Sequence, residues 1–381
     1  MSAGLFAIYH FGGGIDLYPF LYYGLKAMSN RGDVAVAYVY NNGEIRRLEV
    51  DLSREGEGSA PGAAAVGCVY VEDCCKEVDG GVICKFGREE PVPGERPSAT
   101  AYVALTKDGA VYAYRPPRLW HLAVGVHGFD FAIVATEAAV VEVLGGEVRR
   151  SLLGGELLKI HSFGVESASG GEAGELCALE VLYASRLDNV IDGVEVAETR
   201  AKLAEALAEK TRAEVDVAIG VPETGMFYAS ALARRLGVWS PLAFVATARG
   251  RSALLDEVKE RLAVIQLKAN VVKAVVKGKR VMLVDDSVIS GITIRQMTQM
   301  LRGKAGAREI HVAVASPPLR RSCPYGVKTP PESHMIYNHL TPREVAEALE
   351  VDSIVHLEAE EVEKAVGKRL CTLCLRPPLD K

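Results

Sequence analysis

Residues 281–296, V-M-L-V-D-D-S-V-I-S-G-I-T-I-R-Q, indicate how the second half of the chain folds. The run at 281–284 is wholly apolar, as expected of a strand that is buried on both faces inside a parallel sheet. Asp285 and Asp286 follow where this strand should end. Small residues and one glycine come next, and from Thr293 the apolar residues have helical spacing. The predicted order is therefore strand, acidic pair, loop and helix.

This order of elements suits the binding of a sugar phosphate. Open α/β sheets bind ligands at the carboxyl ends of their strands. A phosphate there would meet the backbone N–H groups of residues 291–293 and the positive end of the following helix. The two carboxylates could accept hydrogen bonds from ribose hydroxyls and help to hold Mg²⁺. The plain structural alternative is an acidic turn between a core strand and a surface helix.

Length and composition exclude several classes of protein. A chain of 381 residues is long enough for two or three domains, and 49% hydrophobic with 24% charged residues is typical of globular proteins. The formal net charge of -5 and the lack of a basic block argue against nucleic acid as a partner. The sequence shows neither a run of 18 apolar residues nor the basic start of a signal peptide, so it predicts a cytoplasmic protein without a membrane span.

Asparagine and glutamine are scarce in this sequence, which is one mark of proteins from hot environments. Intracellular proteins of hyperthermophiles can carry disulfides, unlike most cytosolic proteins. Four cysteines lie close together in the first half of the chain, and their spacing matches no known metal site. Burial or a disulfide is therefore expected for Cys68, Cys74, Cys75 and Cys84.

Residues 1–166 are expected to form a β-rich domain. Short strands alternate with turn residues, and the clearest hairpin joins residues 34–40 to residues 44–50 through an Asn-Asn-Gly turn. An antiparallel sandwich is the simplest way to pack such strands. The small, polar residues at 167–175 are expected to link this domain to the next.

Residues 167–381 are expected to form an α/β domain. Strands are predicted at 178–183, 215–221 and 309–316 in addition to the central strand, with a helix at 196–210. Strands separated by helices of this length indicate βαβ units and a parallel sheet.

The central stretch resembles the phosphoribosyl-pyrophosphate (PRPP) motif of type I phosphoribosyltransferases. The closest form is V-L-L-V-D-D-S-I-V-R-G-T-T of the amidophosphoribosyltransferases. Other segments resemble the same family in the same order, which is specific to it: residues 183–193 (Y-A-S-R-L-D-N-V-I-D-G), 221–225 (V-P-E-T-G, the pyrophosphate loop), 250–252 (G-R-S, the mobile loop), 268–270 (K-A-N) and 316–326 (S-P-P to C-P-Y-G).

The resemblance implies a type I phosphoribosyltransferase domain that binds Mg²⁺ and PRPP. It assigns the ribose hydroxyls to the two aspartates, the 5-phosphate to the loop after them, and the pyrophosphate to the loop at 223–225 and to cations of the mobile loop. Implied magnesium-site residues are Thr224, Asp285 and Asp286. The implied PRPP-binding residues are Asp285, Asp286, Ser287, Ser290, Gly291, Thr293, Glu223, Thr224, Gly225, Arg249, Arg251 and Lys268.

Three departures from the family remove positive charge or a hydroxyl near the polyphosphate. Ser290 stands where the family has arginine, and Ile292 where it has a threonine. The family's K-N-R-Y becomes V-A-T-A at residues 245–248, which removes two more cations. Weakened PRPP affinity or turnover is the expected result.

The C-x-x-C pair of Cys371 and Cys374 has good but not unique spacing for two thiolates of one metal site. Buried, unligated cysteines and a four-cysteine zinc site are alternatives. Cys177 and Cys323 stand where iron-sulfur members of the resembled family have their other two ligands, which would complete a [4Fe-4S] cluster. Only the resemblance favours iron-sulfur over zinc.

The first domain resembles the family's glutaminase, a β-rich sandwich of the N-terminal-nucleophile (Ntn) hydrolase type, but without its chemistry. Aligning residues 4–8 with the family's start puts Ala3 at the position of the nucleophilic cysteine. Tyr70 replaces an arginine that grips the substrate carboxylate. Asp108 is aligned with the oxyanion-hole asparagine, where a carboxylate would repel developing negative charge. Glutaminase activity is therefore expected to be lost.

Together these features predict an enzyme that forms 5-phosphoribosylamine and pyrophosphate from PRPP and ammonia, at the entry to purine synthesis. The ammonia would be free or supplied by a separate protein, and a homo-oligomer is expected. Two alternatives stay open: a non-catalytic relative that senses PRPP or nucleotides or binds a partner, and a phosphoribosyltransferase with another acceptor. Pyrophosphate release would distinguish among the three, whereas PRPP binding would not.

Overall fold

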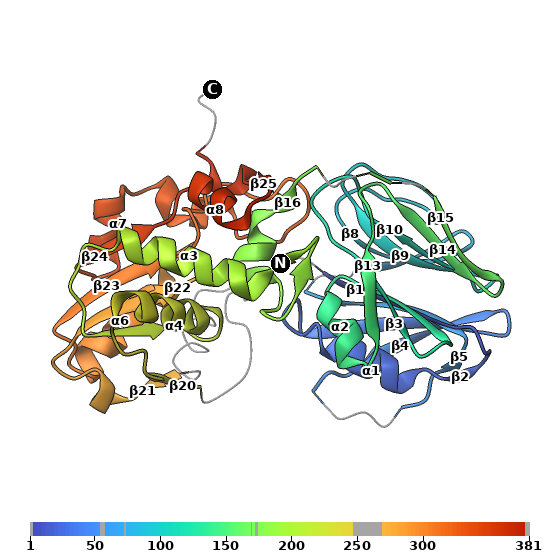
Figure 1. Ribbon diagram of the computed structural model, residues 1–381, viewed down its shortest axis with the longest axis horizontal. Coiled ribbons are helices and arrows are strands. Elements are labelled where there is room, and N and C mark those ends of the chain that lie inside the picture. The colour runs from blue at the N-terminus through green and yellow to red at the C-terminus, as the bar shows by residue number, and fades with distance from the viewer. Residues whose placement is uncertain are drawn as a thin grey trace.

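The computed structural model has two domains that lie side by side, with the β-rich first domain on the right of Figure 1 and the α/β second domain on the left. The predicted fold class, a β sandwich followed by a parallel-sheet α/β domain, is confirmed. The structure describes residues 3–53, 58–71, 74–168, 170–171, 174–246 and 269–377.

The first sheet of the first domain has seven antiparallel strands in the order β13-β11-β12-β1-β6-β3-β4. The predicted Asn-Asn-Gly hairpin joins β3 to β4, and its Asn42 and Gly43 have φ angles of 48° and 91°, as such tight turns require. The strands are β1 (Gly4–His10), β3 (Val34–Asn41), β4 (Glu44–Val50), β6 (Ala64–Tyr70), β11 (Ala123–His127), β12 (Phe131–Ala135) and β13 (Glu147–Ser151).

The second sheet has six antiparallel strands in the order β15-β14-β10-β9-β8-β7. The strand of this sheet that comes last in the sequence, β15, crosses the domain boundary predicted at residue 166. The strands are β7 (Cys75–Val78), β8 (Gly81–Phe86), β9 (Ala101–Thr106), β10 (Val111–Tyr114), β14 (Leu157–His161) and β15 (Gly164–Ala168); a separate pair joins β2 (Ile15–Asp16) to β5 (Pro61–Gly62).

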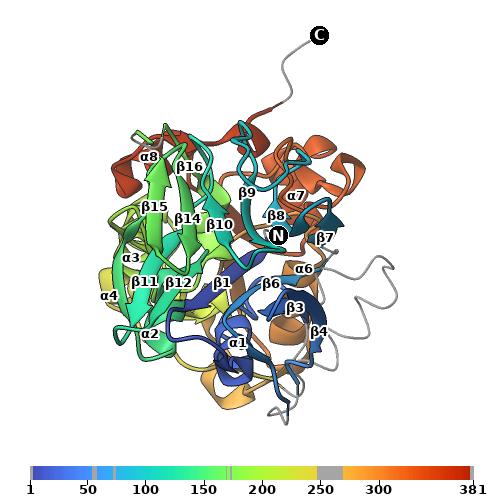
Figure 2. The ribbon, with the colours of Figure 1, turned by 90° about the vertical axis from the view of Figure 1, so that its right-hand side faces the viewer.

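The two sheets pack face to face. Side chains alternate along each strand, so every second residue of a strand faces the core between the sheets. Leu5 and Ala7 of β1 lie in the core between the sheets, whereas Phe6 and Ile8 pack with residues of two helices on the other face. These helices, α1 (Tyr18–Lys26) and α2 (Ala138–Val143), lie below the first sheet in Figure 1, and Figure 2 shows the sandwich from its free end.

The outer face of the second sheet is covered by the Pro- and Glu-rich loop that precedes β9. The hydroxyl of Tyr102 donates to the carbonyl of Glu95 at 2.8 Å, and that of Tyr114 donates to the carbonyl of Pro97 at 2.9 Å. Both tyrosines are almost completely buried. A loop therefore shields this face.

The second domain contains a parallel sheet, as predicted, and its four strands have the order β19-β22-β23-β24. A short antiparallel pair, β20 (Phe244–Ala246) and β21 (Ala269–Val271), lies apart from it. The elements are β19 (Val217–Gly220), β22 (Arg280–Asp285), β23 (Glu309–Val314), β24 (Ser353–His356), α3 (Val196–Lys210), α4 (Thr224–Leu236), α6 (Ile292–Gln299), α7 (Pro342–Ala348) and α8 (Ala359–Val366).

The predicted strand at residues 178–183 is wrong, because Glu180–Ala184 forms a short π-helical segment, η1. Residues 178–182 are all buried. The run is short and apolar apart from Glu180, and such a run does not distinguish a buried strand from a buried helix, which explains the error. The helix at 196–210 is confirmed with the predicted bounds.

A buried ion pair network centred on Arg31 joins the two domains. Its guanidinium donates to Glu180 of the second domain at 2.7 and 3.0 Å and to Glu137 of its own domain at 2.7 Å. All three residues are at most 8% exposed. Charges this far from water are stable only when they are paired, so the network requires both domains in place.

The segment at residues 183–193, which resembles a family motif, also lies at this interface. Asn189 accepts a hydrogen bond from the backbone N–H of Ala138 at 2.8 Å, and Arg115 makes two hydrogen bonds to Asp192. The segment therefore fastens the domains together. No described helix is long and apolar enough to cross a membrane.

Two buried histidines, His121 and His356, are expected to weaken the fold in mild acid. Burial lowers the pKa of each from 6.5 to about 4. The unfolded chain therefore binds protons more readily than the folded chain, so this stability is complete above pH 6.5 and is lost as the pH falls toward 4. Each histidine could account for about 3 kcal/mol across that window. Urea unfolding measured from pH 7 to pH 4 should show the decline.

The variant His121→Gln isolates one of these contributions. His121 contacts the carbonyl of Thr136 and the hydroxyl of Ser151, and a glutamine amide can replace hydrogen bonds without titrating. Its unfolding free energy should fall less steeply with acid than that of the unmodified protein. Equal slopes in the two proteins would contradict the assignment.

Candidate functional site

The candidate site lies where neighbouring parallel strands end. β19 ends at Gly220, which pairs with Val284 of β22, so the loops that follow the two strands share one edge of the sheet. Helix α4 begins at Thr224 after the first loop, and α6 begins at Ile292 after the second. Both helix N-termini therefore lie at the carboxyl edge of the sheet, where such sheets bind ligands.

Gly225 allows the first loop to lie directly on the central strand. A β-carbon at this position would be 2.5 Å from the carbonyl oxygen of Val284, closer than real contacts permit. The loop is held further by the N–H of Val221, which donates to the same carbonyl at 2.8 Å. The peptide bond between Pro222 and Glu223 is cis. The predicted pyrophosphate loop and the acidic pair are thus in direct contact.

Asp285 and Asp286 are held at this edge by backbone and side-chain donors. The N–H of Asp286 donates to Asp285 at 2.9 Å, and the hydroxyl of Ser287 donates to Asp286 at 2.6 Å. Burial raises the pKa of both carboxyls, and the charge on Asp286 adds to the rise at Asp285. Such carboxylates favour a ligand that supplies hydroxyl donors or a cation.

Arg200 of α3 belongs to this site, although the sequence did not single it out. Its guanidinium is buried and donates to the carbonyls of Val181 and Ser185 at 2.9 and 2.8 Å. Its charge opposes the rise in the pKa of Asp286, as does a hydrogen bond with Thr224. Arg200 could not be recognised as a site residue from the sequence, because one arginine on an amphipathic helix normally faces solvent.

The loop after the acidic pair ends in a glycine turn that leads directly into α6. Gly291 has a φ of 74°, a left-handed conformation that favours glycine, and it precedes the first turn of α6. The carbonyl of Ile289 accepts a hydrogen bond from the N–H of Ile336 at 2.8 Å, which ties the loop to the segment before α7. Ser290 and Thr293, two predicted phosphate ligands, are partly exposed beside it.

Predicted cations of the mobile loop cannot be placed. Arg249, Arg251 and Lys268 lie outside the described residues. Before them, Val245 of β20 is 48% exposed at a position where the resembled family has a cation.

The second-domain cysteines, Cys177, Cys323, Cys371 and Cys374, are all buried and all free of disulfides. Cys177 pairs with Cys371 where strand β16 (Leu176–Cys177) runs parallel to β25 (Leu370–Cys371). Burial raises the pKa of Cys374 to about 12, and neighbouring Cys323 and Cys371 add to the rise. The fold therefore brings together thiols from three segments that are far apart in sequence.

The spacing of these thiols bears on which metal they fit. Among the residues that the structure describes, three potential ligand atoms lie within 4.8 Å of one another only at Cys68, Cys75 and Cys84. The second-domain sulfurs are thus spread more widely than the ~3.8 Å between ligands of one tetrahedral zinc ion with Zn–S bonds of ~2.3 Å. An iron-sulfur cluster, in which each cysteine binds a different iron, requires a wider spacing.

Ala3, which the sequence aligns with a nucleophile, directly precedes β1. Gly4 pairs with Val69 in the antiparallel register, which puts Ala3 next to Tyr70. Neither an alanine methyl group nor a phenol replaces the thiol and guanidinium that the resembled glutaminases use there.

The expected position of Asp108 in an oxyanion hole is wrong. Asp108 lies in the β9–β10 turn beside Tyr9, and Gly109 of that turn packs on Tyr40. Tyr9 is near the far end of β1, about 20 Å of extended strand from Ala3 at ~3.3 Å per residue. The resemblance of this turn to a family motif therefore does not extend to its place in the domain.

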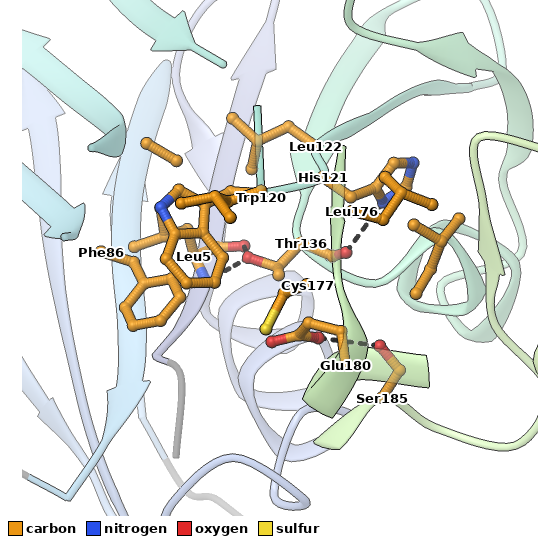
Figure 3. Close-up of a pocket in the computed structure, with 13 residues that line it drawn as sticks. Leu5, Phe86, Trp120, His121, Leu122, Thr136, Leu176, Cys177, Glu180 and Ser185 are labelled. Carbon is orange, nitrogen blue, oxygen red and sulfur yellow. Dashed lines mark hydrogen bonds between the residues drawn. The ribbon is translucent and has the colours of Figure 1, made fainter. Parts of the chain in front are cut away.

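A small cavity of ≈ 10 Å³, with room for about one water molecule, lies between the domains (Figure 3). Leu5 and Thr136 line it from the first domain, and Cys177, Glu180 and Ser185 line it from the second. The cavity thus separates the start of the first domain from one of the second-domain cysteines.

Comparisons with known proteins agree with this arrangement. A family model described as a phosphoribosyl transferase domain matches residues 188–330. The amidophosphoribosyltransferase of Bacillus subtilis is 32% identical over 284 residues, which cover 73% of this chain and 59% of that protein. The amidophosphoribosyltransferase of Archaeoglobus fulgidus is 29% identical over 363 residues, or 91% of this chain and 77% of that protein.

The solved structure of a glutamine PRPP amidotransferase from B. subtilis, complexed with ADP and GMP, matches with a TM-score of 0.81 at 25% identity. The match covers 99% of this chain and 97% of that chain. Fold and site together define a phosphoribosyltransferase domain joined to an Ntn-type β sandwich. The chain belongs to the amidophosphoribosyltransferase family. It spans less than two thirds of the length of several curated relatives, including the B. subtilis protein.

Proposed function

We propose that this protein forms 5-phosphoribosylamine and pyrophosphate from PRPP and ammonia, the first step of purine nucleotide synthesis. The observation that carries the proposal is the pair Asp285–Asp286, of which the first is buried and the second half-buried, set between the loop at residues 221–225 and the N-terminus of α6. Family membership supports the same assignment.

Each part of this edge would take one part of the substrate. The ribose hydroxyls would donate to Asp285 and Asp286, and the 5-phosphate would accept from backbone N–H groups at the start of α6. Mg²⁺, when bound near Thr224 and the carboxylates, would neutralise charge on the pyrophosphate as it leaves. The chain itself orients the ribose so that ammonia reaches C1 opposite the leaving group.

Ammonia, rather than glutamine, is the proposed nitrogen donor. This rests on Ala3, which has no nucleophilic atom, and on Tyr70 beside it, which cannot grip a carboxylate as an arginine would. The ammonia would be free or delivered by a separate protein.

Pyrophosphate release by anaerobically purified protein tests the proposal. With Mg²⁺ and PRPP, release is expected with ammonium salts and not with glutamine, because only ammonia needs no amidase. A control with neither nitrogen source measures hydrolysis of PRPP. Release with glutamine would refute the loss of glutaminase activity. PRPP binding without any release would favour the sensing role, and release only with a nucleobase would favour another acceptor.

We also propose that the second-domain cysteines hold a [4Fe-4S] cluster, which ties β16 and β25 to the loop that contains Cys323. The variant Cys374→Ser is expected to lose iron and acid-labile sulfide and to unfold at a lower temperature, because burial leaves the remaining thiols without a partner. Metal analysis and melting curves of anaerobic samples measure both effects. Zinc in place of iron in the unmodified protein would overturn the proposal. The variant Cys75→Ser, at a cysteine outside this group, is the control and should keep the iron.

A further inference from the structure

The first-domain cysteines, Cys68, Cys74, Cys75 and Cys84, form a second sulfur group that the proposed reaction does not use. The structure has disulfides between Cys68 and Cys74 and between Cys75 and Cys84. The two disulfides touch, since the sulfurs of Cys68 and Cys75 are 3.3 Å apart. All four sulfurs thus lie in one place, between β6 of the first sheet and β7 and β8 of the second.

We propose that this group, when reduced, binds one zinc-class divalent ion through its thiolates. In the oxidised protein the sulfurs of Cys68, Cys75 and Cys84 all lie within 4.8 Å of one another, and those of Cys68 and Cys75 are 3.3 Å apart. Once the disulfides are broken, only small movements would separate the sulfurs to the ~3.8 Å spacing around a tetrahedral zinc ion. The fourth ligand is Cys74, which is adjacent in sequence to one member and bonded to another.

The ligands are carried by a rigid, dry scaffold. Cys68 lies in β6 opposite Leu5 of β1, and Cys84 lies in β8 opposite Val103 of β9. Both cysteines are completely buried in the core between the sheets, whereas Cys75 is half-buried on the edge strand β7. Ligands fixed by strand pairing and shielded from water are preorganised for a metal ion.

The pairing of the disulfides also favours the existence of a reduced, metal-bound state beside the disulfide-bonded one. Each closes a short span of sequence, with separations of 6 and 9 residues, and Cys75 and Cys84 already face each other in the β7–β8 register. Bonds that close short loops restrain the unfolded chain least. The Cys68–Cys74 disulfide links β6 of the first sheet to a residue whose carbonyl accepts from the N–H of Lys85 in β8 at 2.8 Å. A metal ion would add Cys75 and Cys84 of the second sheet to this link, so it would fasten the two sheets together more fully at this end.

The two states interconvert by a balanced exchange. Two molecules of a small disulfide, such as oxidised glutathione, each take two electrons from the zinc tetrathiolate and leave as two thiolates. The four cysteines become two disulfides, and Zn²⁺ is released. A small dithiol reverses the reaction by reducing both disulfides before the ion binds again.

Cobalt(II) is a suitable probe, because tetrahedral thiolate coordination gives it strong, characteristic absorption. The 381-residue protein is reduced under anaerobic conditions and titrated with Co²⁺, and zinc should then displace the cobalt. The variant Cys75→Ser, at a half-buried edge position that tolerates a hydroxyl, is expected to bind Co²⁺ about 10-fold more weakly or not at all. The variant Cys323→Ser is the matched control, and the absorption that reports the first-domain site should persist in it.

Measurements on the unmodified protein complete the test. Oxidised glutathione should abolish the cobalt absorption, and peptide mass spectrometry should then find Cys68–Cys74 and Cys75–Cys84 pairs. The proposal is overturned if the reduced protein does not bind Co²⁺, if Cys75→Ser binds it as the unmodified protein does, or if Cys323→Ser removes all of the absorption. It is also overturned if the two disulfides persist under strong reductant.

Discussion

Replacing Asp286 with asparagine is expected to lower ammonia-dependent pyrophosphate release about 100-fold or more while the protein stays at least as stable. Asparagine keeps an oxygen that accepts from Ser287, so the loop should hold its shape. It removes the charge that would orient ribose hydroxyls and Mg²⁺. Because burial raises the pKa of Asp286, its ionised form is costly in the folded state, and removing that charge should not lower the melting temperature.

The measurement compares initial rates and melting curves of the Asp286→Asn protein with those of Asp130→Asn. Asp130 is an exposed carboxylate in the turn between β11 and β12 of the first domain, so its variant should match the unmodified protein in both respects. A rate within threefold of the unmodified protein would mean that Asp286 does not contact the substrate. A lower melting temperature would mean that the carboxylate stabilises the fold instead.

The central strand, acidic pair and helix could be predicted because their information is local. An apolar run, two carboxylates and a glycine occur within sixteen residues, and each matches the structure that it usually forms. The helix at 196–210 was also predicted correctly, since its alternation of apolar and charged residues has a clear helical period. Residues that share a site within one βαβ unit are thus accessible from sequence alone.

Arg200 and the Arg31 network were not predicted, because their roles depend on which distant residues they meet. Arg200 resembles any charged residue of a surface helix until the fold brings it to the carbonyls of Val181 and Ser185 and close to Asp286. The position of Asp108 was wrong for a related reason. A Lys-Asp-Gly turn is common to many hairpins, and only the strand register places it far from Ala3.

The second-domain cysteines could be predicted only in part from the sequence. Spacing identified Cys371 and Cys374 as a pair, whereas Cys177 and Cys323 depended on resemblance to a family. Their convergence follows from a two-residue parallel pairing, β16 with β25, that joins segments almost two hundred residues apart. Contacts between residues so far apart in sequence cannot be inferred from composition or periodicity.

The variant Arg31→Met is expected to destabilise the protein by about 3–5 kcal/mol, the largest stability effect predicted for a single substitution in this chain. Methionine fills much of the volume of arginine but leaves Glu137 and Glu180 buried without their shared cation. The chain would have to protonate these carboxylates or admit water to them. Because Glu180 belongs to the second domain, the domains should also separate more easily, and one unfolding transition should become two.

Chemical denaturation at pH 7, followed by tryptophan fluorescence and circular dichroism, measures both effects. The control is Arg47→Ala, which removes an exposed arginine that is 3.6 Å from Glu49 and should change the unfolding free energy by less than about 1 kcal/mol. A similarly small change in Arg31→Met would show that the interface does not depend on this ion pair.

A triple variant separates the lost attraction from the cost of leaving charge behind. Arg31→Met combined with Glu137→Gln and Glu180→Gln removes the unpaired charges, and the amides can still bond to Asn30 and Ser185. If the damage comes from uncompensated buried charge, this variant should recover more than half of the lost stability, since a neutral network of similar volume costs little. If it remains as unstable as the single variant, the attraction between Arg31 and its two carboxylates is itself what holds the domains together.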